Sequence, residues 1–151
     1  MIRFSSFREL PYARLLILYH KIMDKELLNT RFNELLSLVG EPYVMLNDDG
    51  TYRGCFRVVQ VLYKEAPRYK MPSKNIEKNY LYGVARIKKH CVEIKPEELQ
   101  KGDIVVTRFR DELHVAIYYE FDKIIHVFKD HTLQIGRLKL FKNYQCFRVK
   151  E

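Results

Sequence analysis

The spacing of apolar residues changes once along this chain, near residue 91, and that change limits the fold that the chain can adopt. Before it, apolar residues recur at helical intervals. After it, short alternating stretches such as "CVEIK", "GDIVVTRF" and "LHVAIYYEF" are rich in β-branched and aromatic residues, as strands are. Helices first and strands afterwards predict an α+β domain.

Two helices are expected within residues 1–40. The first covers residues 12–23 and follows Pro11, a residue that suits a first helical turn. The second lies in "NTRFNELLSLVGEP", where Asn29 or Thr30 can cap its start and Gly40 can end it.

A short helix is expected to begin at Cys55 and to end before Pro67, because "CFRVVQVL" places apolar residues at helical spacing. Residues 68–90 are basic and rich in tyrosine, with weak periodicity. This segment is predicted to be a loop with a short helix over residues 76–82.

The strands that follow are separated by pairs of residues that favour turns. These pairs are Gly102–Asp103, Asp111–Glu112, Asp122–Lys123 and Asp130–His131. Closely spaced strands of this kind predict an antiparallel meander or a small barrel, with the N-terminal helices packed on it.

The amino-acid composition indicates a folded domain, but it is compatible with several functions. A chain of 151 residues with 47% hydrophobic residues can bury a core and is not disordered as a whole. The net charge of +8, from 27 basic and 19 acidic residues, favours anionic partners such as nucleic acid, an anionic lipid surface or a cell-wall polymer. The basic residues are spread along the chain, so a solvated basic surface is the preferred interpretation.

Targeting signals and cysteine usage point to a chain made in the cytoplasm. No stretch approaches the roughly 20 apolar residues that a membrane span needs. The apolar run at residues 15–19 is too short and too closely flanked by charge for a signal peptide. Three cysteines without a pairing pattern predict free thiols, and Cys91 and Cys146 alternate with apolar neighbours as core thiols do.

Cys55 differs from the other cysteines because it follows a glycine at the expected start of a helix. The unpaired N–H groups at a helix start stabilise negative charge, so a thiol there can become a thiolate. A nucleophilic thiolate needs an imidazole as its base, and the imidazole needs a third group to orient it.

Two of the five histidines are candidates for the base of Cys55 and for the group that orients this base. His114 opens the strand "HVAIYY", and His126 lies in the next strand, "IIHVF". A turn near Asp122–Lys123 pairs these strands and brings the two imidazoles close across the ladder, as a base and its orienting group. The alternative is that each histidine is a half-buried sheet residue satisfied by the backbone.

The order cysteine, histidine, histidine after a helical region resembles the NlpC-type papain-like cysteine peptidases, which cut the peptide stems of bacterial cell wall. The resemblance covers residues 31–149. The family's "G-x-P-Y", "P-G-D-L-V", "H-V-G-I-Y" and "M-I-H-A" motifs are matched by "LVGEPYV", "LQKGDIVV", "HVAIYY" and "IIHV". Its "C-S-G-L-V-Q" helix is matched in part by "CFRVVQ".

The resemblance implies a papain-like fold and a role for each matching residue. Cys55 is the implied nucleophile, His114 the general base and acid, and His126 the group that orients His114. Tyr43 matches the family tyrosine whose hydroxyl faces the substrate. A single domain over residues 1–151 is implied, with 1–30 as an N-terminal helical extension.

The chain departs from the family beside the nucleophile. Gly54, Phe56 and Arg57 flank Cys55 where the family has Asp, Ser and Gly. Phe56 and Arg57 are therefore expected to contact substrate and to change its shape requirements. If they fill the cleft instead, the chain is a catalytically inert module that serves in assembly or in binding, as part of a phage tail or on nucleic acid.

Neither a cofactor nor nucleic acid is expected to bind this chain. His90, Cys91, His126 and His131 lack the paired spacing of a metal site, so neither a metal nor another cofactor is predicted. Stretches such as "GRLKLFKNYQCFRVK" mix basic and aromatic residues as nucleic-acid binders do, but such binding gives no reason for the cysteine and histidines.

The expected substrate is peptidoglycan peptide. A wall hydrolase without a signal peptide suggests carriage in a phage tail, with tail proteins as partners and the virion as its location.

Overall fold

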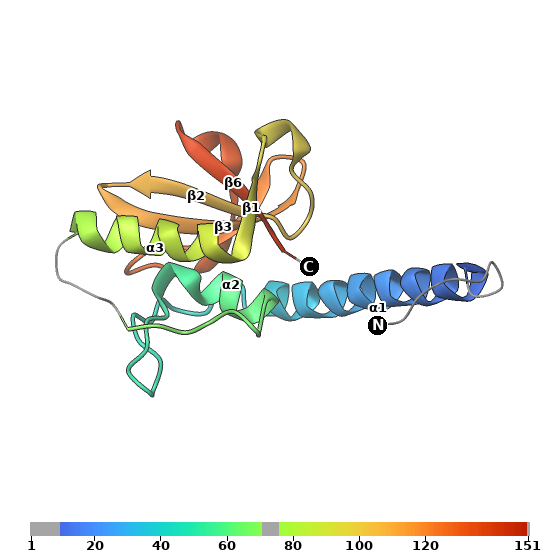
Figure 1. The fold of residues 1–151 in the computed structure, drawn as a ribbon. Helices are drawn as coiled ribbons and strands as arrows, with labels where there is room; N and C mark the ends of the chain where they lie inside the picture. The colour runs from blue at the N-terminus through green and yellow to red at the C-terminus, as the bar shows by residue number, and fades with distance from the viewer. Residues whose placement is uncertain (1–9, 71–75, 151) are drawn as a thin grey trace.

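The computed structural model describes residues 10–70 and 76–150, with side chains described from residue 24 onward and, after the gap, from residue 79. These described residues form three α-helices and a six-stranded antiparallel sheet, an α+β fold as predicted. Figure 1 shows the helices below the sheet and the N-terminal part of the first helix extending beyond the rest of the molecule.

The first helix, α1 (Leu10–Ser37), is one continuous helix where two were expected. Thr30 was expected to cap a second helix, but its hydroxyl donates to the Glu26 carbonyl at 3.0 Å, one turn back inside α1. The connecting sequence "DKELLNT" contains neither glycine nor proline, so nothing in it ends a helix. Phe32 and Leu35, near the end of α1, are fully buried and join the helix to the core.

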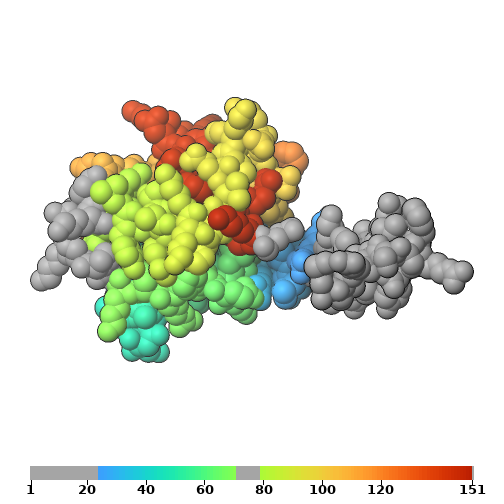
Figure 2. Space-filling model, viewed as in Figure 1, coloured from blue at the N-terminus to red at the C-terminus, as the bar shows by residue number. Residues whose placement is uncertain are grey.

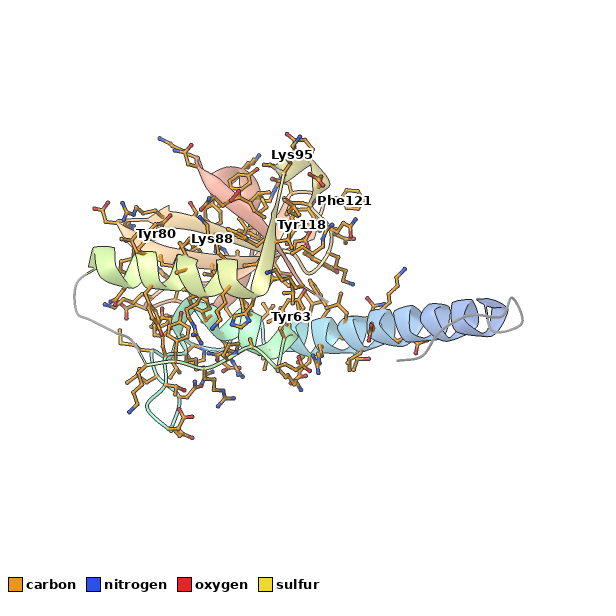
Figure 3. The ribbon with its side chains drawn as sticks, in the orientation of Figure 1. Tyr63, Tyr80, Lys88, Lys95, Tyr118 and Phe121 are labelled. Carbon is orange, nitrogen blue, oxygen red and sulfur yellow. The ribbon has the colours of Figure 1, made fainter. Side chains whose placement is uncertain are left out.

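The cysteine segment begins with a 3-10 turn at Gly54–Phe56 and continues as α2 (Arg57–Leu62). Four of the six α2 residues are buried, and α2 packs against the strands β3 (Glu112–Glu120) and β4 (Lys123–Val127). Tyr63, directly after α2, donates its hydroxyl to the Gly102 carbonyl at 2.8 Å, which ties the end of α2 to the segment before the second strand (Figure 3).

The helix α3 (Ile76–His90) is longer than predicted, and the part after Tyr82 includes four good helix formers, Ala85, Arg86, Lys88 and Lys89. Gly83 lies inside it, and a Cβ atom there would meet Leu113 Cδ2 at 2.3 Å. The glycine therefore allows α3 to approach the third strand closely. Figure 2 shows the segment after α1 lying against α3, and the rings of Tyr69 and Tyr82 are 5.2 Å apart at that contact.

The strands follow the order β1-β6-β2-β3-β4-β5. Their bounds are β1 (Cys91–Ile94), β2 (Ile104–Phe109), β3 (Glu112–Glu120), β4 (Lys123–Val127), β5 (Leu133–Arg137) and β6 (Tyr144–Val149). The expected meander holds from β2 to β5. It fails for the last strand, which enters the sheet between β1 and β2. Two short 3-10 turns, at Pro96–Glu98 and Leu138–Leu140, lie in the connections.

Two tight hairpins set the register of the central strands. Arg110 and Asp111 connect β2 to β3, and Phe121 and Asp122 connect β3 to β4, all with φ between 44° and 66°. Two consecutive residues with positive φ form the turn whose twist matches paired strands. The predicted turn positions were therefore off by one residue.

The sheet separates two apolar clusters. One face carries Val115, Ile117 and Ile125, which pack with α1 and α2 in the main core. The other carries Ala116 and Ile124, with Leu138 and Phe141 packed over them. The helices in the described part of the chain include none that is long and apolar enough to cross a membrane.

Candidate functional site

Cys55 lies in the 3-10 turn before α2, with its side chain only 5% exposed. The Tyr52 hydroxyl and the Leu113 carbonyl oxygen each lie 3.6 Å from its sulfur. Burial raises the pKa of the thiol to about 11, although hydrogen bonds from Tyr52 and from the Val115 backbone act in the opposite direction. The free protein therefore holds Cys55 as a neutral thiol.

His114 and His126 meet on the face of the sheet that carries Ala116. Their rings form a hydrogen bond of 2.9 Å between His114 Nε2 and His126 Nδ1. The two residues are diagonal neighbours and not direct partners, since His126 pairs with Ala116. An irregularity in the pairing between Tyr118 and Glu120 shifts the register, which the sequence did not reveal.

Aromatic rings enclose the two imidazoles. Phe128 stacks on His114 with ring centroids 4.3 Å apart and an interplanar angle of 10°. Phe141 approaches His114 at 5.5 Å and His126 at 5.9 Å. Burial, with a smaller contribution from His126, lowers the pKa of His114 to about 3, and burial lowers that of His126 to about 4. Both rings are therefore neutral near pH 7.

The hydrogen bond between the two rings determines which nitrogen atoms carry hydrogen if His114 is to act as a base. If His114 is to accept a proton at Nδ1, its Nε2 must carry hydrogen and donate to His126 Nδ1, and His126 is then protonated at Nε2. His126 Nε2 is buried, and none of the described residues forms a hydrogen bond with it. Gly136 of β5 allows this close packing, since a Cβ atom there would meet His126 Nε2 at 2.5 Å.

A cleft of about 400 Å³ brings the thiol and the imidazole to one site. Cys55 and His114 both line it, although the sulfur is not hydrogen-bonded to His114. His114 alternates along β3 with Val115, which packs with Cys55 in the main core. The two side chains therefore approach the cleft from the two sides of β3, around its N-terminal end.

Of the three residues expected to contact substrate, Tyr43 lines the cleft, whereas Phe56 and Arg57 do not. Tyr43 is half-buried, and burial raises the pKa of its hydroxyl to about 12. Phe56 is buried in the core, where it packs edge-on against Tyr52 and Tyr69. Arg57 lies beside Glu41, with 3.8 Å between Nη2 and Oε1. Neither Phe56 nor Arg57 lines the cleft that holds Cys55.

Sequence reasoning missed Tyr52, whose hydroxyl lies 3.6 Å from the sulfur of Cys55. The signal that was available is the glycine at position 54. It leaves room for a large ring three residues before the cysteine.

Cys91 and Cys146 are buried free thiols in β1 and β6, as predicted for core residues. Their strand partners are Val149 and Ile94 respectively, so the two cysteines do not oppose one another. Within the described residues, no group of three or more His, Cys, Asp or Glu side chains is arranged to hold a metal ion.

Comparisons with known proteins place these features in a family. The model of the NlpC/P60 family matches residues 40–147, which include Cys55 and both histidines. A comparison with curated proteins finds no match.

A solved structure from Staphylococcus aureus subsp. aureus Mu50, described as similar to a lipoprotein of the NLP/P60 family, has the same fold. Its TM-score is 0.52 at 22% sequence identity, over 83% of this chain. The chain spans only 42% of that protein. Since the family model covers well over half of the sequence, the chain belongs to the NlpC/P60 family.

Proposed function

We propose that this chain is a cysteine hydrolase that cleaves amide bonds in the stem peptides of peptidoglycan. Membership of the NlpC/P60 family supports cell-wall peptidase or amidase chemistry. The observation that carries the proposal is the His114–His126 hydrogen bond of 2.9 Å at a cleft that also contains a cysteine. A base with an orienting partner beside a thiol is the arrangement that nucleophilic catalysis by cysteine requires.

In this mechanism Cys55 transfers its proton to His114 Nδ1, and the thiolate attacks the amide carbonyl carbon. A carbon–sulfur bond forms, the carbon–nitrogen bond breaks, and the departing amine takes the proton from His114. Water, activated by the same imidazole, then hydrolyses the thioester and returns the thiol. His126 holds His114 in the required tautomer and orientation.

Contact between the sulfur and the imidazole has to form during this cycle. Catalytic hydrogen bonds are often long or poorly aligned in a free enzyme and tighten when substrate binds. A peptide in the cleft would also exclude water from both groups, which strengthens the attraction between a thiolate and an imidazolium.

The second candidate is the inert module used in assembly or binding. It is favoured by the neutral state of Cys55, whose thiol contacts the Leu113 carbonyl oxygen instead of an imidazole. Phe56 and Arg57 are not a reason to favour it, because neither side chain occupies the cleft.

Selective alkylation distinguishes these two candidates. Cys55, Cys91 and Cys146 are all buried, and burial raises the pKa of each thiol to about 11. Burial alone therefore predicts that all three react slowly with iodoacetamide. The hydrolase predicts that the Cys55–His114 contact also forms transiently in the free protein, so that Cys55 reacts at least about tenfold faster than the other two thiols. His114→Ala should remove this advantage, and added stem peptides should slow the reaction by occupying the cleft. Equal slow reaction of the three thiols would favour the inert module.

Carriage in a phage tail, with tail proteins as partners, stays a prediction from the sequence. Mass spectrometric detection of the chain in purified tail particles would support it, and its absence from them would contradict it.

A further inference from the structure

The Tyr52 hydroxyl is oriented as a hydrogen-bond donor to the sulfur of Cys55. The two atoms are 3.6 Å apart, and either could donate. The thiol has a single proton, which points to the Leu113 carbonyl oxygen at 3.6 Å, an atom that can only accept. The Tyr52 hydroxyl must then supply the hydrogen of its own contact with the sulfur.

The backbone and ring of Tyr52 are fixed on several sides. Its N–H donates to the Tyr69 carbonyl at 2.7 Å, and its carbonyl accepts from Gln60 Nε2 at 3.0 Å. Its ring packs edge-on against Phe56 at 5.8 Å and lies 6.1 Å from the ring of Tyr69. The hydroxyl therefore reaches the sulfur without ordering a mobile side chain.

Gly54 creates the space that this hydroxyl occupies. A Cβ atom at position 54 would meet Tyr52 Oη at 2.3 Å, and the ring carbon Cζ at 2.5 Å. Any side chain at position 54 would therefore displace the phenol from the thiol. The placement of the Tyr52 hydroxyl beside Cys55 therefore depends on the glycine at position 54.

A thiolate at Cys55 would need such a donor. Deprotonation ends the contact with Leu113 and leaves a negative sulfur facing a carbonyl oxygen in a site only 5% exposed. The titratable groups that face this thiol or share its cleft are Tyr43, Tyr52, Tyr69, Glu112 and His114. Arg110, Lys129, Asp130 and His131 line the remainder of the cleft. Burial raises the pKa of the Tyr52 phenol far above neutral pH, so it stays a donor.

We propose that the Tyr52 hydroxyl is a catalytic hydrogen-bond donor that holds the Cys55 thiolate in the state that attacks substrate. The inference deepens the proposed hydrolase function and rests on it for its catalytic role. The thiol proton passes to His114, and Tyr52 keeps its own proton throughout. As the sulfur–carbon bond forms, the sulfur loses its charge and the hydrogen bond weakens. When thioester hydrolysis releases the Cys55 thiolate, the hydrogen bond from Tyr52 to the sulfur strengthens again.

The test is the pH dependence of Cys55 alkylation in the full chain. Iodoacetamide is the probe, and the Cys55 peptide is quantified by mass spectrometry from about pH 6 to about pH 11. Because burial raises the pKa of Cys55 to about 11, the shift of the titration midpoint is read from the displacement along the pH axis of the rising part of the rate curve. Tyr52→Phe removes only the hydrogen-bond donor. It should raise the midpoint of the Cys55 titration, the pH at which half of the thiol is ionised, by about one pH unit. At neutral pH the thiolate fraction falls about tenfold, but its intrinsic nucleophilicity rises about threefold, so alkylation slows about threefold.

Tyr69→Phe is the matched control, because it removes a phenol from the same aromatic cluster, and it should leave the midpoint unchanged. An unchanged or lowered midpoint in Tyr52→Phe would overturn the proposal. If that variant does not fold, 3-fluorotyrosine at position 52 tests the same donor. This stronger acid should lower the midpoint, and no change would overturn the proposal.

The outcome is separate from that of the hydrolase proposal. A shifted midpoint in a protein that cleaves no wall peptide would keep the Tyr52–Cys55 interaction and remove the hydrolase. If the protein cleaves wall peptides but Tyr52→Phe leaves the Cys55 midpoint unchanged, the hydrolase proposal stands and the role of Tyr52 is wrong.

Discussion

At the scale of single residues, the hydrogen bond between His114 and His126 makes acid–base behaviour a property of the pair. Both rings lie among aromatic side chains, and both lose basicity through burial. Within the described residues His126 Nε2 is buried and has no hydrogen-bond partner, which is a cost in hydrogen bonding of packing the pair there. The sequence predicted that these histidines meet but not their environment, because Phe109, Phe128 and Phe141 come from separate parts of the chain.

The lowered pKa values predict a specific loss of stability in acid. The ordinary histidine pKa is 6.5, and the folded values are about 3 for His114 and about 4 for His126. Below pH 6.5 the unfolded chain binds protons that the folded chain does not. The free energy of unfolding should therefore fall by about 1.4 kcal/mol per pH unit for each histidine as the pH decreases toward 4.

Urea unfolding at a series of pH values measures this slope. His126→Asn should flatten it, whereas the exposed His90 provides a control in His90→Asn, which should not. Equal slopes in the unmutated protein and in His126→Asn would show that His126 titrates normally in the fold.

At the scale of elements, the sequence predicted the types of helix and strand better than their connections. Local periodicity identified the strands, because each has one face toward a core. The insertion of β6 between β1 and β2 depends on partners distant in sequence, which periodicity cannot show. Asp103 is one such partner: Arg148 of β6 donates to its carboxylate at 2.8 and 3.0 Å, and the Gln100 N–H donates at 2.7 Å. The "GD" motif therefore serves to attach β6 to the start of β2.

This attachment predicts unequal effects for two identical substitutions. Asp103 is 4% exposed, so Asp103→Asn leaves a buried site short of an acceptor and should cost about 2 kcal/mol of unfolding free energy. Asp122→Asn, at the exposed ion pair with Arg137, should cost less than about 1 kcal/mol. Thermal unfolding of both variants measures the difference. Equal losses would mean that Asp103 does not anchor β6.

At the scale of the whole molecule, one domain of the NlpC/P60 family accounts for residues 40–147, and α1 lies before it. The family motifs predicted the placement of Cys55, His114 and Tyr43 at one cleft, because these residues lie on elements that the fold brings together. They did not predict the burial of Phe56, because a position beside the nucleophile does not reveal whether a side chain faces the cleft or the core. Tyr52 was missed for a related reason: its role depends on the space left by Gly54.

Digestion of purified peptidoglycan, followed by mass analysis of the released peptides, tests the central claim most directly. The unmutated chain should release peptides cut at one type of amide bond, and Cys55→Ala should release none while keeping the same far-ultraviolet circular dichroism. His114→Ala should be about as damaging, since nucleophile and base act as one unit, and His126→Asn should be milder. Release of no peptide by the folded, unmutated protein across several wall chemistries, or equal release by Cys55→Ala, would contradict the account.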